Sequence, residues 1–204
     1  YADSSEDELL EMMNFIKKRK EEQMMGGHTG RGKRKNKNLA IQAAKYLRKS
    51  DGPRVAVFEV NGFDTHAAQG GVDGTHTKCL VEMDEIINNL KDNLQEAYKD
   101  TIILTVTEFG RTIKQNGGNG TEHGYGTAIF MVGGLLKKSQ VHTDWPGLKR
   151  KELYDGRDLN ATIDARSVYA SAMSTVFDLD FKRIQKDVFW GEDLQNLSDK
   201  LFKA

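Results

Sequence analysis

Apolar residues recur at two different spacings along this 204-residue chain, and together they predict alternating helices and strands. Over Thr77–Tyr98 they return every three or four residues, which predicts a long helix with one packed face. Runs of β-branched and apolar residues flank this helix at Arg54–Val60 and Thr101–Thr107, and another follows at Ala128–Val132. Strand, helix and strand in this order predict a right-handed βαβ unit whose first two strands are parallel neighbours or near neighbours. The expected fold class is therefore α/β, with a mostly parallel sheet flanked by helices.

Other helices are predicted at Ser5–Gln23, Leu39–Arg48 and Ala165–Phe177. No internal repeat or linker interrupts the chain, so residues 1–204 are expected to form a single domain. Residues 26–38 are rich in glycine, lysine and arginine, which predicts a mobile basic loop. Part of this loop, Gly27–Lys33, resembles the start of a phosphate-binding P-loop. Arg34 stands where that motif needs serine or threonine, so we reject a nucleotide site there.

Charge and cysteine content exclude several classes of site. The chain has 30 basic and 30 acidic residues, which gives no whole-chain electrostatic attraction to nucleic acid. The single cysteine, Cys79, excludes an internal disulfide and a multi-cysteine zinc site, and its apolar helical setting predicts a core residue. No apolar run is long enough to span a membrane. The chain begins at Tyr1 without a leader, and nothing in it fixes an oligomeric state.

Polar residues follow the predicted strands at the points where a ligand site is expected. Open parallel sheets bind ligands at the carboxyl ends of their strands. Asp64 and His66 follow the first strand, Glu108 and Arg111 follow the second, and His123 lies in a glycine-rich loop before the third. Imidazole and carboxylate groups suit zinc, manganese or iron, and an arginine can clamp an anionic oxygen. Taken singly, these residues also fit a turn cap, a Glu–Arg ion pair and a solvated histidine, whereas the set together favours a metal site.

Several motifs in order then resemble a known family. They are GFDTH (Gly62–His66), TEFGRT (Thr107–Thr112), TEHGYG (Thr121–Gly126), GG (Gly133–Gly134), DWPG (Asp144–Gly147) and DGRDL (Asp155–Leu159). From about Leu39 to its end the chain resembles the bacterial domain of unknown function family 1501, grouped with the alkaline-phosphatase-like superfamily.

The resemblance implies an alkaline-phosphatase-like fold, here incomplete at its N-terminal side, and one metal ion held by Asp64, His66 and His123. A second metal would fall on Glu108 and Phe109, and phenylalanine cannot bind it. The superfamily's nucleophile lies on an N-terminal strand that precedes the matching region. A periplasmic or cell-surface location is also implied.

Three functions follow as expectations. The first is a metal-dependent hydrolase of small phosphate or sulfate esters, using zinc or alternatively manganese, with Glu108 beside the metal and Arg111 steadying negative charge. Without the nucleophile segment, this fragment would be inactive. The second is a non-catalytic binding or structural module on the same fold. The third and weakest is nucleic-acid binding through the basic cluster at 31–37, which salt-dependent binding would reveal.

Overall fold

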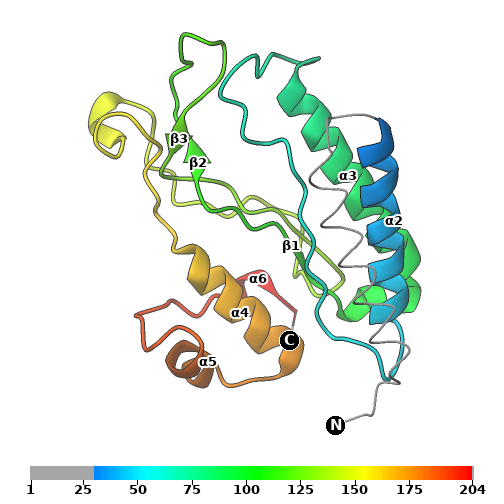
Figure 1. Ribbon diagram of the computed structural model, residues 1–204. Helices are drawn as coiled ribbons and strands as arrows, with labels where there is room; N and C mark the ends of the chain where they lie inside the picture. The colour runs from blue at the N-terminus through cyan, green and yellow to red at the C-terminus, as the bar shows by residue number, and fades with distance from the viewer. Residues whose placement is uncertain (1–29, 204) are drawn as a thin grey trace.

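The computed structural model describes residues 30–203, which form two helical groups joined by long extended segments (Figure 1). The first group comprises α2 and α3, and the second comprises α4, α5 and α6. The elements in chain order are α2 (Gly30–Leu47), α3 (Thr75–Leu94), the 3-10 helix η1 (Gln95–Asp100), β1 (Ile103–Leu104), β2 (Gly110–Arg111), β3 (His123–Gly124), β4 (Met131–Val132), the 3-10 helix η2 (Arg150–Glu152), α4 (Ala165–Phe177), α5 (Phe181–Asp187) and α6 (Ser198–Leu201).

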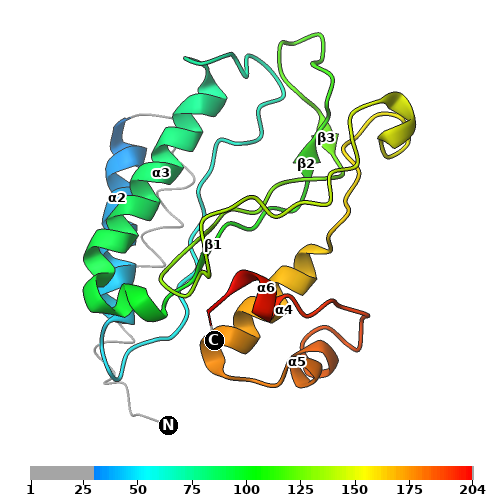
Figure 2. The ribbon, with the colours of Figure 1, turned by 180° about the vertical axis from the view of Figure 1, so that it is seen from behind.

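Helices α2 and α3 lie side by side, and the apolar stripe of α3 is what joins them (Figures 1 and 2). Ala40 and Ala44 of α2 pack with three buried aliphatic residues of α3, which are Ile86, Leu90 and Leu94. The small alanine side chains let the two helix backbones approach closely, and the aliphatic side chains of α3 fill the space between them. The predicted long helix is confirmed as α3 continued by η1, and the predicted helix at Leu39–Arg48 forms the second half of α2.

The basic segment is helical where a loop was expected. Residues 30–38 belong to α2, so the loop prediction is wrong for that part, and residues 26–29 lie outside the described residues, as does the predicted helix at Ser5–Gln23. Glycines and like charges lower helix propensity, but α2 continues into the residues that pack on α3, and tertiary packing overrides propensity. Asn36 also ties α2 to α3 by donating a 2.6 Å hydrogen bond from its side-chain amide to Glu82.

The mostly parallel sheet is wrong, and with it the alkaline-phosphatase-like α/β fold. Within residues 30–203 there are two small antiparallel sheets of two strands each, β1 with β4 and β2 with β3. The expected strands at 101–107 and 128–132 do pair, but with each other and antiparallel, through Ile103 with Val132 and Leu104 with Met131. The expected strand Arg54–Val60 forms no ladder with any described residue. A β-branched run indicates an extended conformation, and it does not specify a pairing partner.

The second helical group is built around α4, which has the bounds that the sequence predicts. One face of α4 packs on the C-terminal segment through a cluster of Val168, Ala172, Leu197, Leu201 and Phe202. Another face packs on α5 and the following turn through Ala170, Phe181, Ile184 and Leu194. Across residues 30–203, no helix has both the length and the apolar content needed to cross a bilayer.

Asp164 caps the N-terminus of α4 and gives the first testable consequence. Its carboxylate accepts a 2.8 Å hydrogen bond from the Arg166 backbone amide and pairs with the Arg166 guanidinium. We expect Asp164→Ala to lower the free energy of unfolding by about 1 kcal/mol in denaturant titrations at neutral pH. Asp144→Ala, at an exposed aspartate that begins no helix, is the matched control and should change it by less than about 0.5 kcal/mol.

The same carboxyl makes the cap sensitive to acid. The Arg166 side chain holds the pKa of Asp164 below its usual value of 3.8. A group whose pKa falls on folding stabilises the folded state above its unfolded pKa, and loses this contribution as the pH falls through the folded pKa. The difference in the free energy of unfolding between wild type and Asp164→Ala should therefore shrink as the pH falls below 3.8. A difference that stays constant through this range would contradict the cap.

Candidate metal centre

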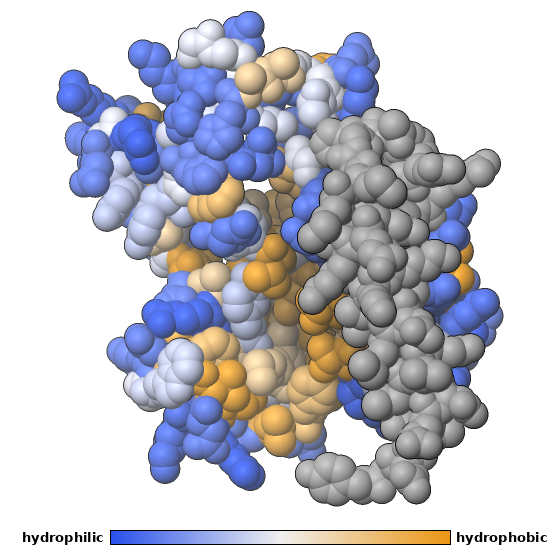
Figure 3. Space-filling view, in the orientation of Figure 1, coloured by the Kyte–Doolittle hydropathy of each residue, from blue (hydrophilic) through white to orange (hydrophobic). Residues whose placement is uncertain are grey.

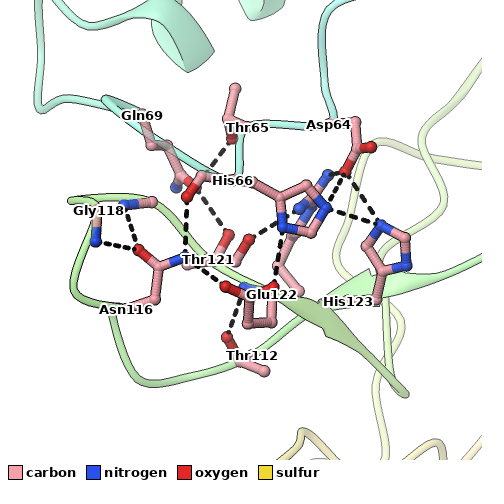
Figure 4. Close-up of polar contacts among 12 residues, drawn as sticks. Asp64, Thr65, His66, Gln69, Thr112, Asn116, Gly118, Thr121, Glu122 and His123 are labelled. Atoms are coloured by element: carbon pink, nitrogen blue, oxygen red, sulfur yellow. Dashed lines mark hydrogen bonds and ion pairs between the residues drawn. The ribbon is translucent and has the colours of Figure 1, made fainter.

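Asp64, His66 and His123 converge on one point, as Figure 4 shows. One ligand atom from each of them lies within 4.8 Å of the other two, and they form the sole such group among the described histidines, cysteines and acids. The two imidazole Nε2 atoms are 3.1 Å apart, and each also lies 3.1 Å from Oδ1 of Asp64. Between 44 and 56% of each side chain is exposed, so the point where they meet is open to solvent.

The sequence also places Glu108 and Arg111 at this site, and the structure treats them differently. Glu108 is exposed and is not one of the three clustered residues. Arg111 is drawn into the cluster because the β2–β3 register sets it opposite His123. Its guanidinium contacts Asp64 and donates hydrogen bonds to the carbonyl oxygens of Phe63 at 3.1 Å and Thr121 at 2.9 Å.

Arg111 therefore joins the two loops that carry the metal-ligand candidates. Only 19% of its side chain is exposed, and three acceptors engage the guanidinium that was expected to clamp a substrate. Its hydrogen bond, together with that of His123, holds the pKa of Asp64 below its usual value. Asp64 is thus a carboxylate at neutral pH, the form in which it can bind a cation.

Glu122 and Asn116 orient His66, a role that the sequence analysis did not predict. Glu122 Oε2 lies 2.9 Å from His66 Nδ1. A carboxylate only accepts, so Nδ1 carries the proton here, and in the neutral imidazole Nε2 then presents its lone pair to the cluster. The Asn116 amide donates hydrogen bonds to the other Glu122 oxygen, at 2.5 Å, and to the His66 carbonyl, at 2.8 Å. These contacts lower the pKa of Glu122, the bond from Asn116 contributing most.

Phe109 orients the second histidine. Its ring stacks on His123 with the ring centroids 3.7 Å apart and the planes inclined by 17°. The resemblance would put half of a second metal site at this position, where phenylalanine cannot bind a metal. Here the phenylalanine ring instead restricts the rotation of the His123 imidazole, which keeps its Nε2 directed at Asp64.

The loop that carries His66 and the loop before His123 fit closely against each other. Ala68 and Gln69 donate backbone hydrogen bonds of 2.9 Å to the carbonyls of Gly118 and Asn119. A side chain at Gly120 would come within 2.3 Å of the His66 backbone, so this close approach requires glycine. Glu122 is the second residue of the TEHGYG motif and Gly120 directly precedes it, but only the fold reveals what these two residues contact.

Comparisons with known proteins agree with the motif order. The family described as protein of unknown function (DUF1501) matches residues 3–186 of the chain. No curated protein and no solved structure matches the chain. What the site can do therefore rests on the geometry of its own residues.

Proposed function

Because the chain belongs to the DUF1501 family, whose description names no activity, we propose a function from the site itself. The protein binds one divalent metal ion, zinc in preference to manganese, through Asp64, His66 and His123. With this ion it hydrolyses phosphate or sulfate esters. The observation that carries this proposal is the spacing of the three donor atoms. Two ligands of a tetrahedral zinc ion lie about 3.3 Å apart when each bond is about 2.0–2.1 Å long. The 3.1 Å separations among these donors fit that spacing closely.

The donor types and their supports fit the same ion. Two imidazoles and one carboxylate form a ligand set used by catalytic zinc, and structural zinc sites have four protein ligands instead. Metal-binding histidines usually donate their other ring N–H to a carboxylate or carbonyl, which fixes the tautomer and the ring orientation. Glu122 accepts from His66 in this way at 2.9 Å. The half-exposed ligands leave room for water and substrate beside the ion.

A zinc ion held by three protein ligands supplies a Lewis acid and a water whose pKa falls to about 7. The surrounding residues prepare the site for this chemistry. Arg111 holds the Asp64 and His123 loops together, Glu122 directs His66, and Phe109 directs His123. Such a water would serve as the nucleophile, so this scheme would not need a nucleophilic side chain.

Arg157 supplies the positive charge that an anionic ester requires. Its guanidinium lies 3.5 Å from the His123 carbonyl oxygen, and 62% of its side chain is exposed. The hydrogen bond to Asp158 holds its pKa above its usual value, so it stays charged at any physiological pH. Arginine is well suited to bidentate contacts with phosphate and sulfate oxygens. Arg157 thus takes the substrate-binding role, and Arg111 the positioning one.

The competing proposal is a module that performs no chemistry. Arg111 neutralises Asp64 from within the protein, and the cluster can be read as hydrogen bonds that fasten two loops. Metal content and turnover distinguish the cases. The protein, stripped with chelator and then titrated with zinc or manganese, should hydrolyse p-nitrophenyl phosphate or sulfate only when metal is restored. Metal binding without turnover would leave a binding module, and absence of binding would leave a structural cluster.

Replacing Glu122 with alanine tests the supporting network. We expect the affinity for zinc to fall by about 10- to 100-fold, because His66 loses the group that fixes its tautomer and orientation. Isothermal titration calorimetry of the chelator-stripped protein measures this directly. Glu108→Ala is the matched control, since Glu108 is an exposed glutamate outside the cluster, and its affinity should match wild type. Equal losses in the two variants would point to a general charge effect and would argue against the network.

A further inference from the structure

A large apolar cleft runs between α3 and the α4 group, beside the candidate metal centre. It encloses about 1650 Å³, beyond the range of about 300–1,000 Å³ that accommodates small molecules. Leu80, Met83 and Ile87 of α3 line one wall, and Tyr169, Met173 and Val176 of α4 line the other. Figure 3 shows hydrophobic residues gathered around the hollow in the middle of this face. The size of the cleft indicates a polypeptide occupant.

The segment of residues 54–60 lines this cleft, and its backbone has no strand partner within the part of the chain that the structure describes. The backbone groups of residues 55–61 make no hydrogen bond to any other described residue. Its side chains alternate as in a strand: Phe58 and Val60 pack against the α2–α3 core, while Val55 and Val57 are 62% and 87% exposed. Val106 and Phe130, on neighbouring extended segments that also line the cleft, are 69% and 51% exposed. Such an edge is a template for another strand.

These features define the chemistry of what binds there. Main-chain N–H and C=O groups that no described residue pairs require a partner that offers its own backbone in extended conformation. Apolar walls on both sides require apolar side chains on both faces of that strand, as in a strand buried between two layers. We propose that the cleft binds an extended apolar segment of a partner polypeptide, which pairs with residues 55–61 by strand addition.

The bound strand would reach the candidate metal centre. Asp64 lies three residues after the pairing segment, and Asp64 and Arg111 line the same cleft. Strand addition therefore orders the backbone that leads into the Asp64 loop. The docking surface does not depend on a metal ion, so its test is independent of the proposed hydrolysis.

The probe is a fluorescent synthetic peptide with about six alternating valines and isoleucines, flanked by lysines for solubility. We expect saturable binding to the full chain and slower hydrogen exchange at residues 55–61 on binding. Val57→Lys should weaken binding at least about tenfold, because it sets a charge on the pairing edge. Val141→Lys is the matched control, since Val141 is 88% exposed and lies outside the cleft, and it should bind as wild type does.

In a strand, the backbone amides of alternate residues face opposite edges. Two further peptides are therefore N-methylated, one at the odd and one at the even residues, so that each peptide lacks the amide donors of one edge. At least one of them should bind at least about tenfold more weakly if backbone pairing holds the strand. Equal binding of all three peptides, no binding at all, or amides at 55–61 already protected in the free protein would overturn the proposal. A dimer seen by sedimentation and lost in Val57→Lys would also overturn it, since the occupant would then be a second copy.

Discussion

Replacing His66 or His123 with alanine is expected to weaken zinc binding by more than about a hundredfold. Each imidazole is a direct donor to the proposed ion, and losing even a supporting group costs about 10- to 100-fold. Both Nε2 atoms lie 3.1 Å from the same Asp64 oxygen, so each imidazole occupies its own ligand position. The remaining histidine cannot fill the position that the other one leaves. Isothermal titration calorimetry on chelator-stripped protein measures the affinities, and circular dichroism shows whether the helices remain.

His142→Ala controls for the loss of an imidazole as such. His142 lies away from the cluster, next to Gln140, and its removal should leave zinc affinity unchanged. If both cluster variants bind zinc as tightly as wild type, the ion is bound elsewhere and the proposed hydrolase mechanism fails.

Phe202→Ala is expected to produce the largest loss of stability, about 3–5 kcal/mol in the free energy of unfolding. Phe202 is 2% exposed and has the largest of the fully buried side chains in the described part of the chain, where it packs with Val168 and Ala172 of α4. Its backbone also bridges to Leu136, which ties the C-terminal segment to the chain after β4. Removing the ring leaves a cavity where three segments meet.

Denaturant unfolding followed by circular dichroism measures this loss. Trp190→Ala is the control, because Trp190 is 90% exposed and its removal should change the free energy by less than about 0.5 kcal/mol. A loss below about 1 kcal/mol for Phe202→Ala would mean that the C-terminal segment contributes little to the core.

The helices could be predicted from the sequence because their signal is local. The apolar stripe of α3 and the bounds of α4 follow from a period of 3.6 residues within one segment. The sheet could not be predicted in this way. Arg54–Val60 and Thr101–Thr107 have strand-like sequences, but the βαβ rule assumes that they pair. In the fold Ile103 and Leu104 pair with β4 instead, and that choice depends on contacts far apart in the chain.

The metal-ligand candidates converge for a different reason from the expected one. Asp64, His66 and His123 were predicted to meet at the edge of a parallel sheet. They meet because the β2–β3 register and the hydrogen bonds of Arg111 bring their loops together. Residue types and motif order identified these three. The direction of the Glu122 side chain toward His66 is set by Asn116, and neither contact leaves a pattern in the sequence.

Diffraction at the zinc absorption edge, from crystals grown with zinc and without chelator, tests whether Asp64, His66 and His123 bind one zinc ion. We expect one anomalous peak per chain, about 2.0–2.2 Å from His66 Nε2, His123 Nε2 and an Asp64 carboxylate oxygen. His66 Nδ1 should remain hydrogen-bonded to Glu122. An anomalous map without a peak among these three side chains, with zinc bound at another site or at none, would rule out the proposed metal centre.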